Sequence, residues 1–152
     1  SALHGMKKRN IWKNVKAPLQ LIKDKRGRIV DVFYKDNINH IAVIDSKAGF
    51  RRGDHYHKKT IQHMLITKGA LEYWHKPLTS KKPAKYELLK VGDLVTTPPF
   101  EVHALNIVSD NQFIVFTHGK RGGKDYESDT FRVKPSIIRR PLKPWPKKKK
   151  KK

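Results

Sequence analysis

The strongest constraint on the fold is the alternation of short β-branched and aromatic segments with turn residues. Residues 29–34 (IVDVFY), 41–45 (IAVID) and 112–117 (QFIVFT) are typical strands, and glycine, proline, asparagine or aspartate separates them from their neighbours. No segment carries an apolar repeat of 3.6 residues over a dozen positions. Further strands are expected over residues 60–67, 71–75, 86–91, 94–97, 104–108 and 130–133. The chain is therefore predicted to be all-β, a small antiparallel β-barrel or jelly roll.

The length of 152 residues suits one domain with a single core. Residues 1–20 are expected to form a leader and an N-terminal arm, in which Ser1–Gly5 precede Met6 and look vector-derived. Residues 21–140 are expected to form the barrel domain. Residues 141–152 (PLKPWPKKKKKK) are expected to be a disordered tail, because like charges repel and proline favours extended chain.

Composition narrows the possible chemistry. The absence of cysteine excludes disulfides, thiolate metal ligands and cysteine nucleophiles, and it fits a cytoplasmic protein. No apolar run is long enough to predict a membrane helix. The net charge of +22, six of it from Lys147–Lys152, attracts polyanions. Since no nucleic-acid motif is visible, we expect only non-specific nucleic-acid binding through this lysine tail.

Two histidines one residue apart mark the candidate site. Side chains alternate along a strand, so His55 and His57 are expected on one face. Gln62 follows on the next predicted strand, on the same face as Met64, and His103 lies far downstream after Pro98-Pro99. A closed antiparallel barrel can gather these four polar side chains. Four other histidines are expected to be hydrogen-bonded structural residues, namely His40, His63, His75 and His118.

The intervals around these residues resemble the two motifs of the cupin family. The first has the form G-x5-H-x-H-x(3,4)-E-x6-G. It is matched in every interval by Gly49, His55, His57, Gln62 and Gly69, with glutamine in place of glutamate. The second has the form G-x5-P-x-G-x2-H-x3-N. It is matched at Gly92, Pro98 and His103, whereas Phe100 replaces its second glycine and Asn106 falls one residue early.

Within the cupins, the run RRGDHYHKKTIQ is similar to that of dTDP-4-keto-6-deoxyglucose 3,4-ketoisomerases. Its start is also similar to that of dTDP-4-dehydrorhamnose 3,5-epimerases. The resemblance implies an isomerase or epimerase that acts on a nucleotide-linked keto-deoxysugar in polysaccharide biosynthesis, and a homodimer. The segment DYESDTFRV resembles the end of such cupins, and Tyr126 would match the tyrosine that the epimerases use as an acid.

Two interpretations of the histidines stay open. In the first, no cofactor is required: His55 removes a proton next to a sugar ketone, His57 shuttles or donates a proton, and Gln62 binds a hydroxyl or orients His55. In the second, a divalent metal such as Zn²⁺, Ni²⁺, Mn²⁺ or Fe²⁺ is bound by His55, His57, Gln62 and His103. A neutral glutamine would compensate none of the metal's charge, which weakens this alternative.

The substrate-binding prediction comprises Arg51, Gln62, Tyr73 and His103. If the strand is regular, Arg51 shares the inward face with His55 and His57, where a guanidinium would hold a diphosphate. Tyr73 and Trp74 must point to opposite faces, so one of them is expected to line the barrel and the other to pack outside it.

Overall fold

A computed structural model describes residues 5–119 and 123–140. In chain order the elements are β1 (Lys7–Asn10), β2 (Leu21–Asp24), β3 (Gly27–Val30), β4 (His40–Ser46), β5 (Arg51–Tyr56), β6 (Ile61–Lys68), β7 (Ala70–Pro77), β8 (Lys85–Lys90), β9 (Asp93–Thr97), β10 (Glu101–Asn106), β11 (Asn111–His118), α1 (Gly123–Ser128) and β12 (Phe131–Arg132). The helix α1 was not predicted from the sequence.

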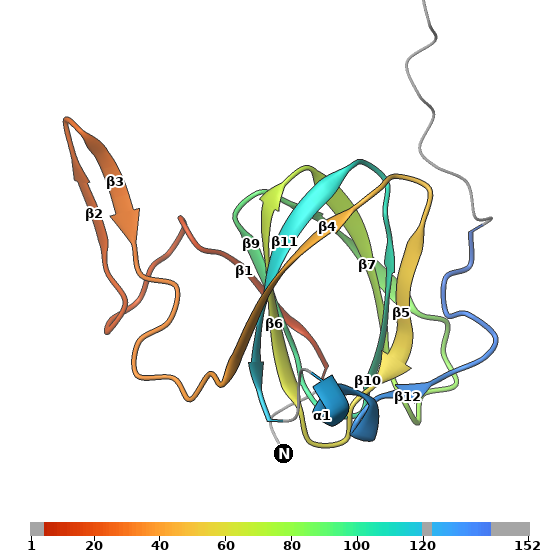
Figure 1. The fold of residues 1–152 in the computed structure, drawn as a ribbon. Helices are drawn as coiled ribbons and strands as arrows, with labels where there is room; N and C mark the ends of the chain where they lie inside the picture. Colours follow the sequence, from red (N-terminus) through yellow and green to blue (C-terminus); the bar gives the residue numbers. More distant parts are fainter. Residues whose placement is uncertain (1–4, 120–122, 141–152) are drawn as a thin grey trace, which may run out of the picture.

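Two antiparallel five-stranded sheets face each other and enclose the interior of the barrel (Figure 1). Their strand orders are β1-β9-β6-β11-β4 and β12-β5-β10-β7-β8. The prediction of an all-β jelly roll is confirmed. Because strands distant in sequence are neighbours in both sheets, residues from β5, β6 and β10 reach the same interior.

The core lies between the two sheets and follows the alternation of side chains along each strand. On β6, Met64 and Ile66 are buried in the same cluster as Phe113 and Val115 from the neighbouring strand β11 and Leu71 from β7 of the facing sheet. The predicted turn between β6 and β7 is present at Gly69. Its φ of +69° is one that side-chain-bearing residues rarely adopt, and a Cβ atom there would collide with the Asp110 carbonyl oxygen.

The N-terminal region divides into a barrel strand and a projecting hairpin. Residues 1–20 were expected to be a leader and an arm, yet β1 within them pairs with β9 at the edge of the first sheet. The strand expected over residues 29–34 ends at Val30, the last residue of β3. Among the described residues, β2 and β3 pair only with each other, and their hairpin projects away from the barrel (Figure 1).

The C-terminal segment covers the outer face of the second sheet. Ile137 and Ile138 pack on Trp74, Val102 and Ala104. The predicted tail over 141–152 lies outside the described residues, as do Ser1–His4 and residues 120–122. No helix in the described part of the chain is long and apolar enough to cross a membrane.

Candidate active site

Three histidines from two neighbouring strands meet inside the barrel. His55 of β5 pairs directly with His103 of β10, and His57 follows at the end of β5. The ring centroids are 4.7 Å apart for His55 and His103, 5.0 Å for His55 and His57, and 5.3 Å for His57 and His103. One nitrogen of each ring lies within 4.8 Å of one nitrogen of each other ring. The expected gathering of these imidazoles is therefore present.

Backbone carbonyl groups fix the orientation of two of the rings. His57 Nδ1 lies 2.7 Å from the carbonyl oxygen of Asp129, and His103 Nδ1 lies 3.0 Å from that of Glu101. Since a carbonyl oxygen only accepts, both Nδ1 atoms must carry the hydrogen. In the neutral rings Nε2 then holds the lone pair, which suits either a base or a metal ligand. Both histidines are only 3% exposed.

Asp129 holds the turn that follows the histidine pair. Its carboxylate accepts hydrogen bonds from the backbone N–H groups of Lys58, Lys59 and Thr60, and from Thr60 Oγ1, over 2.7–3.1 Å. Burial alone would raise the pKa of Asp129, but these hydrogen bonds favour the ionised form and lower the pKa overall. The same residue therefore fixes the ring of His57 and the chain leading to Gln62.

Gly53 and Asp54 interrupt the regular alternation of β5. Their φ angles are +88° and +58°, and the register with β10 shifts between His103 and Ala104, which is a β-bulge. As a result Arg52, not Arg51, lies opposite the core residue Leu105. The regular strand assumed for Arg51 is thus wrong. Arg51 nevertheless lines the cavity beside the histidines, and it donates a hydrogen bond to the carbonyl oxygen of Arg140.

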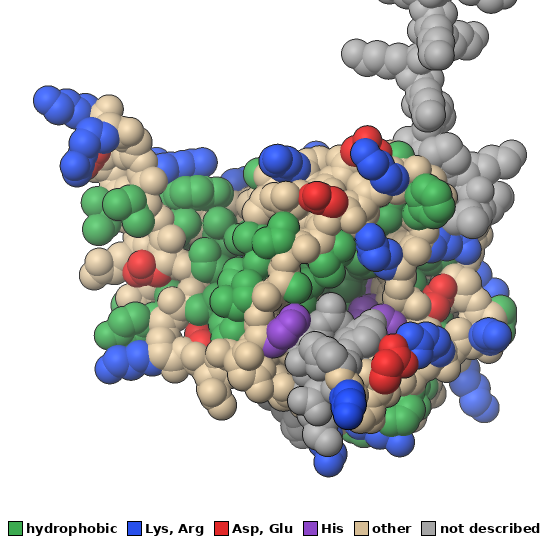
Figure 2. Space-filling model, viewed as in Figure 1, with side chains coloured by type: hydrophobic (Ala, Val, Ile, Leu, Met, Phe, Trp, Pro, Cys, Tyr) green, Lys and Arg blue, Asp and Glu red, His purple; other side chains and the backbone are tan. Residues whose placement is uncertain are grey.

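A cavity of about 280 Å³ opens beside the histidines. Polar and basic side chains line one part of it, namely Arg51, Arg52, His55, Gln62, His103 and Arg132. Apolar side chains line the rest, namely Ile44, Met64, Leu105, Phe113 and Val115. In Figure 2, histidine side chains are visible in a hollow whose wall is hydrophobic. No carboxylate is among these lining residues, so an anionic ligand meets only positive or neutral groups.

Tyr73 and Trp74 point to opposite faces, as expected. Trp74 packs outside the barrel, whereas Tyr73 is buried inside, where its hydroxyl lies 2.5 Å from Thr97 Oγ1. The Tyr73 ring is parallel to His103, at 6.3 Å between centroids. Tyr73 supports His103 from behind and is not among the residues that line the cavity. Its predicted contact with substrate stays a prediction.

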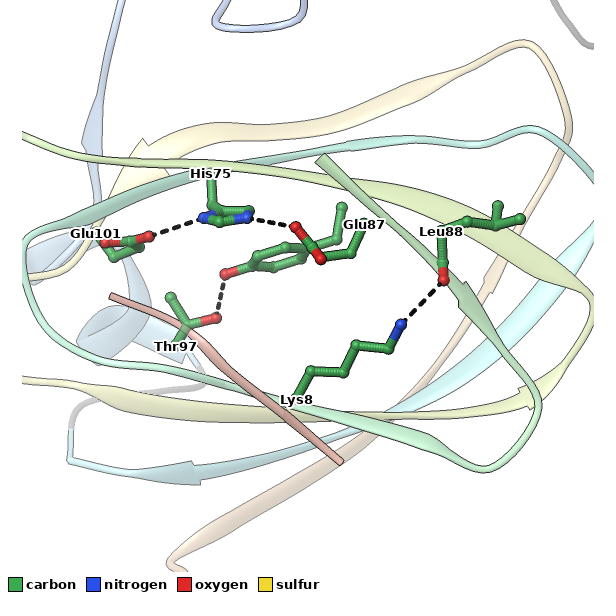
Figure 3. Close-up of polar contacts among 7 residues, drawn as sticks. Lys8, His75, Glu87, Leu88, Thr97 and Glu101 are labelled. Carbon is green, nitrogen blue, oxygen red and sulfur yellow. Dashed lines mark hydrogen bonds and ion pairs between the residues drawn. The ribbon is translucent and has the colours of Figure 1, made fainter. Parts of the chain in front are cut away.

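His75 was expected to be a structural histidine, and the structure gives it two acidic partners (Figure 3). Its ring nitrogens lie 3.2 Å from Glu101 and 3.0 Å from Glu87. Burial lowers the pKa of His75, but the two carboxylates outweigh burial and raise the pKa overall. Because His75 pairs with His103 across β7 and β10, this histidine and its two carboxylates are direct neighbours of the site.

Sequence reasoning preferred Arg51 over Arg52, missed Arg132 and Asp129, and could not place Tyr126. Arg132 pairs with His55 through β12 and lines the cavity, and Asp129 anchors His57. Both belong to the segment DYESDTFRV, so its resemblance to the end of sugar-modifying cupins was the available signal. Tyr126 lies in α1, but its side chain is outside what the structure describes, so its predicted role stays a prediction.

Solved structures share this fold at low sequence identity. A dTDP-4-dehydrorhamnose 3,5-epimerase from Sulfolobus tokodaii matches with a TM-score of 0.63 and 20% identity, over 80% of this chain and 77% of that one. A sugar 3,4-ketoisomerase from Thermoanaerobacterium thermosaccharolyticum, solved in complex with TDP, gives 0.65 and 16%, over 87% and 90%. A TDP-quinovose 3,4-ketoisomerase from Campylobacter jejuni gives 0.66 and 15%, over 89% and 98%.

Sequence comparison supplies the family. No curated protein matches the chain significantly. Residues 22–131 match the family described as polysaccharide biosynthesis C-terminal domain, and this range holds the histidines, Gln62 and Asp129. The solved structures share the jelly-roll fold in which these residues lie. The chain therefore belongs to the polysaccharide biosynthesis C-terminal domain family.

Proposed function

We propose that this protein is an isomerase or epimerase of a nucleotide-linked keto-deoxysugar. The observation that carries the proposal is one cavity lined by His55, His103 and arginines, without a carboxylate. The arginines suit a diphosphate, and the apolar wall suits a deoxysugar. The known proteins with this fold include a ketoisomerase solved with TDP, which supports this substrate class.

The proposed chemistry is proton transfer next to the sugar ketone. His55 takes the proton from the carbon beside the carbonyl group, which leaves an enediolate. The proton of the neighbouring hydroxyl then passes to the former carbonyl oxygen, and the proton held by His55 is returned to the former carbonyl carbon to complete the isomerisation. His57 lies behind His55 and exchanges protons with it, because its Nδ1–H is held by Asp129 and its Nε2 is the basic atom. Gln62, only 9% exposed, binds a sugar hydroxyl at the cavity wall.

The test is His55→Gln assayed with TDP-4-keto-6-deoxyglucose in D₂O. Loss of a general base should lower turnover and deuterium incorporation by about 10²–10⁴-fold. His118→Gln is the matched control, because His118 lies outside the cavity and contacts His63 and the Asn37 carbonyl. A His55→Gln protein that melts normally and exchanges deuterium at the rate of the unmodified protein would exclude His55 as the base.

A divalent metal at the same histidines is the second candidate. Three imidazoles with nitrogens within 4.8 Å, two of them fixed through Nδ1, fit the three-histidine ligand set of catalytic metal sites. His55, His57 and His103 would hold the ion, Gln62 would supply a neutral oxygen, and the ion would polarise the sugar ketone. Elemental analysis after purification without chelating resin tests this candidate. Less than about a tenth of an equivalent of metal per chain, together with activity retained in EDTA, excludes it.

We also propose a homodimer that uses the β2–β3 hairpin. An isolated two-stranded hairpin is marginal in water, yet this one carries Ile29 at 66% exposure and projects from the barrel. On the edge strand β4, Val43 is 62% exposed and one side of the strand has no described partner. A second copy would cover both surfaces. Light scattering should give twice the chain mass, and Ile29→Ser with Val43→Ser should give the monomer mass.

A further inference from the structure

A second pocket lies on the outer face of the sheet whose inner face carries His103. Its volume is about 230 Å³, and it lies between the loop after β7 and the segment 133–139. Val102 of β10 lines it, while the next residue, His103, points into the barrel. The two cavities share no lining residue. A ligand in this second pocket would be separated from the histidines by the thickness of the sheet.

Five cationic side chains surround this outer pocket. They are Lys76, Lys81, Lys82, Lys134 and Arg139. No carboxylate lines the pocket, and within residues 5–119 and 123–140 none of the five forms an ion pair. Like charges repel when they converge on a concave surface, so an anion that enters relieves this repulsion.

The floor of the pocket is apolar. Leu78, Val102, Val133 and Ile137 form it, and Val102 and Ile137 are almost fully buried. Low-dielectric walls concentrate the field of the surrounding cations inside the pocket. The same floor offers a surface to a non-polar part of the ligand.

Tertiary hydrogen bonds hold both walls in place. The backbone N–H groups of Val133 and Ile137 donate to the carbonyl oxygen and the carboxylate of Asp54, each at 2.9 Å. On the other wall, Leu78 N–H donates to the Phe100 carbonyl oxygen at 2.9 Å, and Lys76 Nζ to the Ser80 carbonyl oxygen at 2.6 Å. The cations are therefore displayed around a preformed concavity.

We propose that this outer pocket binds the phosphate groups of a small phosphorylated ligand, at a site separate from the catalytic cavity. Phosphate matches the chemistry because lysine and arginine are its usual partners and several charges need compensation. The volume admits a diphosphate and is too small for a duplex nucleic acid, so the ligand class is a small molecule. The proposal does not depend on the isomerase assignment, since no residue is shared.

The experiment is calorimetric titration of the full chain with inorganic pyrophosphate. Lys82→Gln with Arg139→Gln removes two exposed charges from the pocket and leaves its hydrogen-bonded walls intact. Lys23→Gln with Lys25→Gln, on the β2–β3 hairpin, removes the same net charge elsewhere. Arg52→Gln reports on pyrophosphate that binds in the histidine cavity, which also attracts anions.

We expect the affinity for pyrophosphate to fall at least about tenfold in Lys82→Gln/Arg139→Gln, because charge-assisted hydrogen bonds are lost. In Lys23→Gln/Lys25→Gln and in Arg52→Gln it should fall less than about twofold. Equal losses in both double variants would mean that binding follows net charge, which overturns the proposal. A loss confined to Arg52→Gln would place pyrophosphate in the histidine cavity and would also overturn it. Absence of measurable binding to the unmodified chain has the same consequence.

Discussion

Asp129→Asn tests whether one buried carboxylate organises the histidine site. One Asp129 oxygen accepts three hydrogen bonds, from Lys59 N–H, Thr60 N–H and Thr60 Oγ1, and the other oxygen accepts one from Lys58 N–H. Asparagine keeps one oxygen and places an NH₂ group against the remaining donor. Three charge-assisted bonds become neutral ones and the fourth is lost.

The expected cost follows from the strengths of these bonds. A hydrogen bond to a charged group contributes about 1.5–3 kcal/mol and a neutral one about 0.5–1.5 kcal/mol, so three conversions at about 1 kcal/mol each and one complete loss should lower the free energy of unfolding by about 5 kcal/mol. With a typical urea dependence of about 1–3 kcal/mol per M for a small domain, the denaturation midpoint should fall by roughly 2–5 M. Urea denaturation followed by tryptophan fluorescence measures the shift.

The pH dependence of the free energy of unfolding gives a second, independent check on the role of Asp129. The pKa of Asp129 is lowered in the folded protein, so its contribution is present above its ordinary value of 3.8 and is lost as pH falls through the folded pKa. The difference between Asp129→Asn and the unmodified protein should therefore be constant at neutral pH and close only in acid. Glu127→Gln, which changes the same charge at an exposed ion pair, is the control. Equal midpoints for the two variants would refute the role assigned to Asp129.

Three further substitutions test the surroundings of the site. Gly53→Ala should destabilise the fold by about 2 kcal/mol or more and lower turnover, because its Cβ would lie 2.8 Å from the His103 carbonyl oxygen at a φ of +88°; an unchanged melting temperature would contradict this. His75→Gln should lower the free energy of unfolding below pH 6.5 and have less effect as pH rises through the raised pKa of His75, because its two carboxylates stabilise the charged ring. Chemical denaturation at pH 5.5 and 9 measures the two losses of stability, and equal losses at both pH values would count against the prediction. Phe100→Gly should not lower the melting temperature although it removes an aromatic ring, because a φ of +62° costs phenylalanine about 1–2 kcal/mol; a drop of more than a few degrees would show that its stacking on Tyr56 outweighs the strain.

Phe100 also illustrates how a motif read from sequence can be correct about backbone shape where the residue itself differs. The cupin motif has glycine at this position, and phenylalanine here still adopts the left-handed conformation that glycine would favour. Its backbone N–H donates to the His57 carbonyl oxygen at 2.7 Å and its own carbonyl oxygen accepts from Leu78. The turn is set by these tertiary hydrogen bonds, which compensate for the unfavourable φ.

Local pattern alone determined the fold class, the inward face of β6 and the shared face of His55 and His57. That His103 joins this pair followed only from the assumed closed barrel and the resemblance to cupins. Alternation along a strand depends only on backbone geometry, and the interval between two histidines is a property of the chain. The same reasoning missed the irregular path of the strand at Arg51, which lines the cavity all the same, because a bulge at Gly53–Asp54 depends on how β5 pairs with β10 and on the C-terminal segment that Asp54 binds.

The partners of the histidines were decided only by tertiary structure. Asp129 is 72 residues from His57, and Glu101 and Glu87 reach His75 from two other strands. No local signal encodes such contacts, since they arise when distant segments are packed against one another and their polar groups must find partners away from water. The residue types of a proton-transfer or metal site were readable in sequence, whereas the orientation of each ring and the charge beside it required the closed barrel.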